Sequence, residues 1–158
     1  DLNRTIVAAV AGLLLALSAF AAGTTDFSGT WVLNTDKGQN LGMVKAVDES
    51  IVVTQSADKL VIDFTSKFML KTTRRQVSYD LKGGPVPNEG AMGDKAQTVA
   101  KWVNGKLVVT WTSEGAVAGS TTVKTETRWL SADGNEMSVE TVRANKPPMV
   151  LVYDKKKK

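Results

Sequence analysis

The residue types that most often carry out chemistry in proteins are absent from this chain. The sequence contains no cysteine and no histidine. The first absence excludes disulfides, thiolate metal sites and cysteine nucleophiles. The second excludes a Ser-His-Asp triad and the common zinc ligand sets. Acid–base catalysis would therefore need paired carboxylates.

The strand pattern does not place two carboxylates together as such a pair. Asp63, Glu126 and Glu140 fall on the predicted outward faces of strands, and Asp80 and Glu114 fall near strand ends. The spacing of a calcium loop, D-x-D-x-D-G, does not occur. We therefore expect no enzyme, no metal site and no cofactor.

Aromatic, basic and apolar residues at strand spacing are better candidates for binding. The candidate ligand-binding residues are Phe64, Arg75, Tyr79, Trp111, Thr127, Met137, Arg143 and Tyr153. Two interpretations of this set stay open. The side chains can line a cavity, with an arginine anchoring an anionic head group, or they can fill a core, with the arginines at the rims.

The elements that would position these residues have the two-residue period of β-strands. Strands are predicted at residues 28–34, 50–55, 60–65, 72–81, 96–103, 107–112, 122–130, 136–143 and 149–154. In 122–130 the pattern turns Val123, Thr127 and Trp129 inward and Lys124, Glu126 and Arg128 outward.

The connections between these segments are mostly short. Residues 35–49 are predicted to be a connection with one turn of helix. Residues 82–94 hold two prolines and four glycines, which exclude a central strand. Asn104-Gly105 is typical of a tight hairpin turn. The fold class is therefore all-β, a single antiparallel up-and-down barrel of eight or nine strands.

The N-terminal segment has the pattern of a secretory signal. Residues 6–20 are almost wholly apolar, Arg4 precedes them, and Ala19-Phe20-Ala21 provides a small-x-small cleavage site. We expect a helical signal peptide at 1–21, a barrel domain at 22–154 and a lysine tail at 155–158. An uncleaved N-terminal anchor is the alternative. The expected location is outside the cell or in the periplasm.

The charge distribution argues against a nucleic-acid partner. The net charge is +4, and Lys155 to Lys158 supply four positive charges. The rest is close to neutral, whereas a duplex binder needs a clustered basic face. We also expect a monomer and no stable membrane insertion of the mature chain.

The segment Phe27-Ser28-Gly29-Thr30-Trp31 resembles the calycin superfamily, which includes lipocalins and fatty-acid-binding proteins, and most of all the lipocalin-like secreted proteins of bacteria. Gly29 and Trp31 match the Gly-x-Trp motif that opens these barrels. The resemblance implies that Trp31 plugs the closed end and packs on an arginine of a late strand. Arg128 and Arg143 both remain candidates.

Two departures from fatty-acid-binding proteins are visible. Residues 35–49 are too few for their helix-turn-helix lid. Their last strand carries an arginine two residues before a tyrosine, and here Leu151 precedes Tyr153. The resemblance thus does not imply carboxylate binding by that pair.

These observations predict a secreted barrel that binds a small hydrophobic or amphipathic molecule in its lumen. The alternative is a filled barrel with a structural or interaction role through its loops or basic tail. An isomerase or lyase of calycin type is the third possibility.

Overall fold

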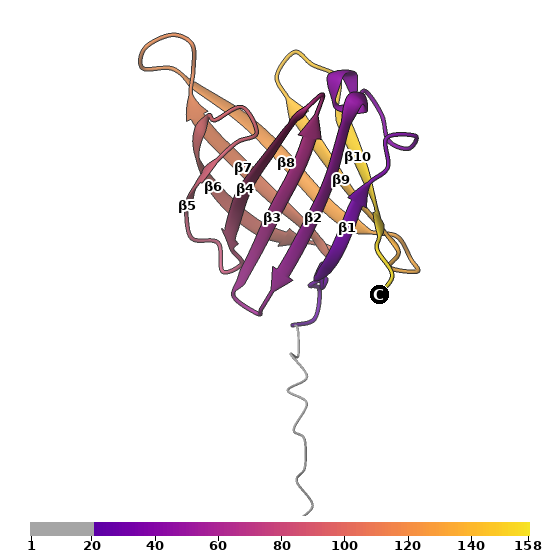
Figure 1. The fold of residues 1–158 in the computed structure, drawn as a ribbon. Coiled ribbons are helices and arrows are strands. Elements are labelled where there is room, and N and C mark those ends of the chain that lie inside the picture. Colours follow the sequence, from indigo (N-terminus) through magenta and orange to yellow (C-terminus); the bar gives the residue numbers. More distant parts are fainter. Residues whose placement is uncertain (1–20) are drawn as a thin grey trace, which may run out of the picture.

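A computed structural model describes residues 21–158 (Figure 1). The predicted signal peptide lies, except for Ala21, outside the described residues. The strands are β1 (Gly29–Leu33), β2 (Val47–Gln55), β3 (Lys59–Phe68), β4 (Lys71–Asp80), β5 (Val86–Glu89), β6 (Lys95–Val103), β7 (Lys106–Glu114), β8 (Thr121–Leu130), β9 (Glu136–Arg143) and β10 (Met149–Lys155). A short 3₁₀ helix, η1 (Gly42–Ala46), lies between β1 and β2.

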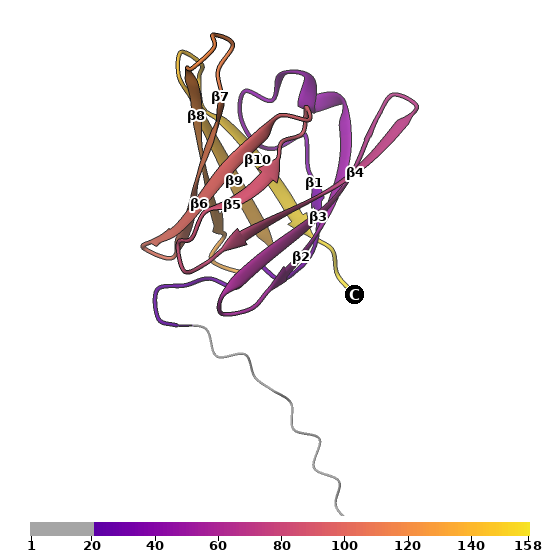
Figure 2. The ribbon, with the colours of Figure 1, turned by 90° about the vertical axis from the view of Figure 1, so that its left-hand side faces the viewer.

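The strands form one antiparallel sheet in the order β4-β3-β2-β1-β10-β9-β8-β7-β6-β5. Each strand pairs with its neighbour in sequence, and β1 also pairs with β10, with Leu33 opposite Tyr153. This pairing curls the sheet into a nearly closed barrel (Figures 1 and 2). The predicted all-β up-and-down barrel is confirmed, as is the single helical turn in residues 35–49.

The strand count of eight or nine is wrong by one missed strand, β5. Its residues include Pro87 and stand among glycines, which is why the segment was predicted to be irregular. β5 is the last strand of the sheet and pairs only with β6. Proline is tolerated there because an edge strand leaves one side of its backbone unpaired.

The barrel has two distinct ends, which the up-and-down topology defines. The closed end holds the chain start at 21–28 and the connections after β2, β4, β6 and β8. The mouth end holds residues 34–46 with η1 and the connections 69–70, 90–94, 115–120 and 144–148. Figure 2 shows the mouth end at the top.

Aromatic packing fills the closed end. Trp31 and Phe27 are both fully buried, and the Trp31 indole Nε1 donates a hydrogen bond to the Phe27 carbonyl at 3.0 Å. The Phe27 ring stacks on Trp102 with ring centroids 6.0 Å apart. Trp31 thus has the plugging position that the Gly-x-Trp motif implied.

The cation that lies over Trp31 is Lys155, with Nζ 5.3 Å from the ring centroid. Neither of the two expected arginines, Arg128 and Arg143, lies over the Trp31 ring as a cation–π partner. Arg128 faces the lumen near the closed end, opposite Leu107 and beside Met137, and Arg143 lies at the mouth end of β9. Lys155 is the cross-strand partner of Trp31 in the β1–β10 ladder, which puts both side chains on one face.

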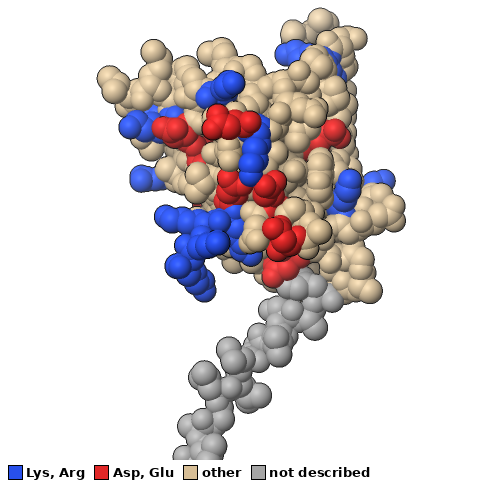
Figure 3. All heavy atoms as spheres, turned by 90° about the vertical axis from the view of Figure 1, so that its right-hand side faces the viewer, with Lys and Arg blue, Asp and Glu red and all other residues tan. Residues whose placement is uncertain are grey.

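The face with the C-terminus carries charges of both signs (Figure 3). Basic side chains gather at the lower corner, where the chain ends in four lysines. Further up the same face, acidic and basic groups alternate, and Lys37 forms ion pairs with Glu136 at 2.7 Å and Asp154 at 3.1 Å.

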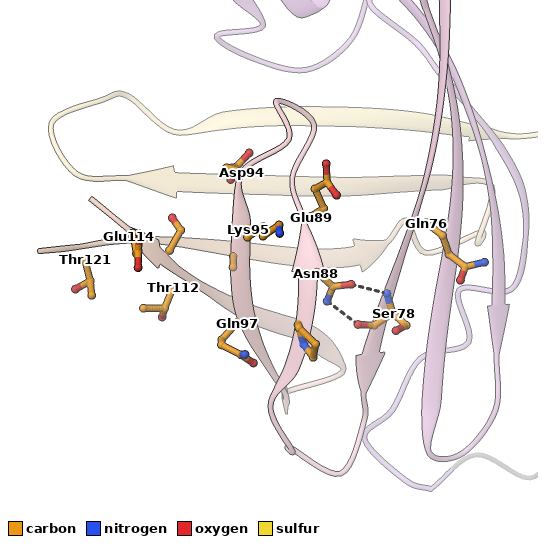
Figure 4. A pocket seen from close by; sticks show the side chains of 13 residues that line it. Gln76, Ser78, Asn88, Glu89, Asp94, Lys95, Gln97, Thr112, Glu114 and Thr121 are labelled. Carbon is orange, nitrogen blue, oxygen red and sulfur yellow. Dashed lines mark hydrogen bonds between the residues drawn. The ribbon is translucent and has the colours of Figure 1, made fainter. Parts of the chain in front are cut away.

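One side chain joins the two sheet edges where the barrel would otherwise be open. The Ser78 amide of β4 donates to Asn88 Oδ1 at 3.0 Å, and Asn88 Nδ2 donates to the Ser78 carbonyl at 2.8 Å (Figure 4). Asn88 Nδ2 also lies 2.8 Å from Thr98 Oγ1, which donates to the Val86 carbonyl at 2.8 Å. The amide of Asn88 thus replaces one residue of the missing ladder.

We predict that Asn88→Ala destabilises the barrel by about 1–3 kcal/mol, because it leaves partly buried polar groups on β4 without partners. Urea unfolding measures this change. Gln97→Ala is the matched control, since Gln97 is an exposed amide on the neighbouring strand β6. Equal stability of the two variants would show that the Asn88 bridge does not hold the barrel closed.

Candidate functional site

The candidate site is the lumen, whose two halves differ. Towards the closed end the lumen is packed with fully buried apolar side chains, among them Leu60, Ile62, Leu107 and Met137. Towards the mouth, inward side chains such as Phe64 and Arg75 are only half-buried. The lumen wall is therefore more exposed to solvent near the mouth than at the closed end.

Most of the candidate ligand-binding residues do face the lumen, and several are in contact. The Arg75 guanidinium lies over the Phe64 ring, 3.9 Å from its centroid. Tyr79 and Trp111 meet edge to face, with centroids 6.1 Å apart at 87°. Tyr153 and Met137 are cross-strand partners on β10 and β9. Three pairs of these residues are thus neighbours in the lumen wall.

Thr127 does not belong to this group. In the β7–β8 ladder Thr127 lies opposite Val108, whereas the buried Leu107 and Val109 lie opposite Arg128 and Glu126. The predicted faces of β8 are therefore exchanged, because cross-strand partners share a face. Thr127, Val123 and Trp129 point outward.

Arg143 has the inward phase but lies at the rim. It is exposed and stands opposite Lys124 near the mouth-end limit of β9. This position agrees with the alternative that the inward-phase arginines sit at rims and reach solvent.

The exchange of faces brings charged groups into the lumen. Lys124 Nζ lies 3.4 Å from Glu126 Oε1 and 4.4 Å from the centroid of the Trp111 ring. Glu49 accepts hydrogen bonds from the Tyr153 hydroxyl at 2.6 Å and from Ser66 Oγ at 2.5 Å. Sequence reasoning missed Glu49 because β2 begins at Val47, three residues earlier than predicted.

Two buried donors in the wall lack good acceptors. The Arg128 side chain is only 5% exposed, and its Nη1 donates to Met137 Sδ at 3.4 Å. Within residues 21–158 it forms no ion pair. Among residues 21–158 the buried Trp111 indole Nε1 has no hydrogen-bond partner of good geometry, and only a weak interaction with the Tyr79 hydroxyl acts on the pKa of that group. A guanidinium has five N–H donors and a sulfur is a weak acceptor, so hydrogen-bonding capacity remains unused.

Burial raises the pKa of both tyrosines of the chain well above the usual 10.0. For Tyr79 the desolvation of the ring comes first, and the Glu126 carboxylate adds to it. For Tyr153 desolvation again comes first, followed by the charge of Glu49 and the hydrogen bond to it. Both hydroxyls are therefore neutral donors over the ordinary pH range.

Two grooves lie on the outer surface, away from this lumen. The larger, of about 1040 Å³, borders the gap between β4 and β5 and includes Gln76, Ser78, Asn88 and Gln97 (Figure 4). The smaller, of about 490 Å³, lies at the closed end beside Trp129. None of the candidate ligand-binding residues lines either groove.

Residues 21–158 hold no group of three carboxylate, histidine or cysteine side chains suited to a metal ion. In the same part of the chain no helix is both long and apolar enough to cross a membrane.

Solved structures with the same arrangement of strands are found among small binding proteins. No family model and no curated protein sequence matches this chain. The fluorescent protein UnaG is 18% identical, with 82% of this chain and 97% of UnaG covered and a TM-score of 0.66. Fatty-acid-binding protein 1 of Echinococcus granulosus is 22% identical, with 82% and 96% covered and a TM-score of 0.61.

A third structure, the fatty-acid-binding protein of Schistosoma mansoni in complex with arachidonic acid, is 17% identical, with 86% of this chain and 100% of that chain covered and a TM-score of 0.63. The chain has the calycin fold. Within it, η1 lies between β1 and β2, and Val44 of η1 packs against the core. Leu151 is partly buried against the same core, so its position in the wall is apolar.

We predict that neither tyrosine ionises near pH 10 while the chain is folded. Because each pKa is higher in the folded than in the unfolded chain, neutral Tyr79 and Tyr153 stabilise the fold fully below about pH 10. This stabilisation is lost as the pH rises through the folded values. Absorbance at the tyrosinate band, followed together with circular dichroism, should show ionisation only when the chain unfolds. Tyrosinate formed near pH 10 in a native chain would contradict the burial of both rings.

Proposed function

We propose that this barrel binds a small amphipathic molecule, with its apolar body in the lumen and an acceptor or anionic group deep in the wall. The observation that carries the proposal is the pair of buried donors without adequate acceptors, Arg128 and the Trp111 indole. A buried guanidinium is costly unless an acceptor compensates it. A ligand carboxylate or similar group would provide that acceptor.

The rest of the lumen supports the same assignment. Phe64 and Tyr79 offer aromatic surface to an apolar ligand, and Met137 is a side chain that adapts to ligand shape. Entry would be from the mouth, where the inward side chains are half-buried. Lipid-binding proteins are present among the similar structures, which agrees with this proposal. The proposed role is therefore that of a binding protein, not of an enzyme.

We expect the full chain to bind oleic acid more tightly than methyl oleate, because only the free acid supplies an anionic acceptor. Hydrogen bonds to charged groups contribute about 1.5–3 kcal/mol, so Arg128→Met should weaken oleic acid binding about 10- to 100-fold and leave methyl oleate almost unchanged. Isothermal titration calorimetry measures both affinities.

Lys106→Met is the matched control for lost charge, since Lys106 lies over Trp129 on the outer face, 4.5 Å from the ring centroid. Trp111→Phe tests the indole donor with little change of shape. Circular dichroism checks that each variant is folded. Equal binding of acid and ester would overturn the role of Arg128. No binding of either compound to the folded chain would favour the filled barrel with an interaction role.

We further propose that the chain is exported from the cell or into the periplasm. The support is the apolar run at 6–20 with Arg4 before it and Ala19-Phe20-Ala21 after it. Expression in a bacterial host followed by fractionation and intact mass should give a product in the exported fraction that begins at Ala22. A full-length product that remains with the membrane would instead indicate an uncleaved anchor.

A further inference from the structure

The inward face of β2 carries a carboxylate near the mouth of the lumen. Glu49 alternates with the buried Ile51 and Val53, so its side chain points inward with theirs. Its Oε1 accepts a hydrogen bond from the Tyr153 hydroxyl at 2.6 Å, and its Oε2 accepts one from Ser66 Oγ. Both donors are neutral hydroxyls, and together they fix the position of the carboxylate in the wall.

The charge of Glu49 has no partner of opposite sign. Within residues 21–158, Glu49 forms no ion pair. The other inward carboxylate, Glu126, pairs with Lys124 at 3.4 Å. The Arg75 guanidinium on β4 lies over the Phe64 ring instead. A carboxylate offers about four lone-pair sites, of which the two hydroxyls use two, so Glu49 keeps charge and acceptor capacity for a further donor.

Tyr153 links Glu49 to Arg128, the buried cation of the same wall. The Tyr153 hydroxyl donates to Glu49, and its cross-strand partner is Met137, whose sulfur accepts from Arg128 Nη1 at 3.4 Å. Desolvation is the main reason for the raised pKa of Tyr153; the charge of Glu49 raises it further, and the charge of Arg128 opposes the rise. One buried ring thus stands between an anion and a cation that both lack a charged partner.

We propose that Glu49 is a second polar subsite of the lumen and binds the ammonium group of an amphipathic ligand. This role rests on the lumen ligand proposed above, whose head group then carries two charges, a carboxylate at Arg128 and an amine at Glu49, as in a long-chain amino acid. An ammonium brings three donors and the missing positive charge, and charge-assisted hydrogen bonds are about twice as strong as neutral ones. An anionic group at Glu49 would be repelled and would find the Tyr153 hydroxyl already engaged.

Four amphiphiles of equal chain length separate the two subsites in calorimetric titrations of the full chain. Dodecylamine carries only the cation, dodecanol is its neutral analogue, and 2-aminododecanoic acid adds the amine to dodecanoic acid. We expect each amine to bind more tightly than the compound without it. Glu49→Gln should weaken dodecylamine binding about 10-fold or more, leave dodecanol almost unchanged and remove the advantage of the amino acid.

Glu140→Gln is the matched control, because Glu140 lies opposite the outward Thr127 on β9, and it should not change dodecylamine binding. Glu49→Gln keeps an acceptor for Tyr153, and circular dichroism checks that the variant is folded. Tyr153→Phe removes one of the two hydroxyl donors, so the intact carboxylate should bind dodecylamine more tightly in this variant. A purely structural role of Glu49 as an acceptor for Tyr153 would not give this gain.

Four results would overturn the amine subsite: no binding of dodecylamine, equal binding of dodecylamine by the wild type and Glu49→Gln, equal weakening of dodecylamine and dodecanol, or no gain in Tyr153→Phe. The anionic subsite at Arg128 is judged separately by the comparison of oleic acid with methyl oleate. A chain that binds oleic acid but not dodecylamine contradicts only the role of Glu49, whereas a folded chain that binds neither contradicts both subsites.

Discussion

The antiparallel pairing of β1 with β10 is the constraint on which the rest of the structure depends. It joins the two halves of one long meander, so every strand from β2 to β9 must have one face inside. The same pairing places Trp31 opposite Lys155 and Leu33 opposite Tyr153, which starts the packing at the closed end. The opposite seam, between β4 and β5, has no ladder and depends on Asn88. One side of the barrel is therefore held by backbone pairing and the other by a side chain.

Closure also decides what the lumen contains, whatever the local sequence prefers. β8 alternates β-branched and charged residues, and taken alone it would bury the first set. In the barrel its register with β7 and β9 places Lys124, Glu126 and Arg128 inside. The lumen wall tolerates these charges because Lys124 pairs with Glu126 and lies over the Trp111 ring. Arg128 has no comparable partner within the described chain. The cost of burying its charged guanidinium is therefore the least compensated by other residues.

Much of the fold could be predicted from the sequence because most strands bury one apolar face. β3 and β7 show this pattern, and Phe64 and Trp111, which were predicted to line the interior, do face the lumen. β5 was not predicted because the proline and glycine residues in and around it are equally common in edge strands and in loops. The two faces of β8 were exchanged in the prediction. The strand has a clear two-residue period, but neither face is apolar enough to show which one points into the lumen. A signal for the correct face was present: Met137 was predicted inward, and the hairpin pairs it with Leu130, which shares its face with Arg128. Cross-strand register, rather than the pattern within a strand, carries that information.

The position of the unpaired donors restricts what the lumen can hold. A wholly apolar ligand would remove the remaining water from Arg128 without replacing its hydrogen bonds, and it would offer no acceptor to the buried Trp111 indole, so such a ligand is disfavoured. A ligand with an acceptor at one end avoids this loss, while its apolar part contacts Phe64 and Tyr79. The ligand that we propose is therefore amphipathic rather than purely hydrophobic. This preference comes from β8, the strand whose inward face the sequence pattern concealed.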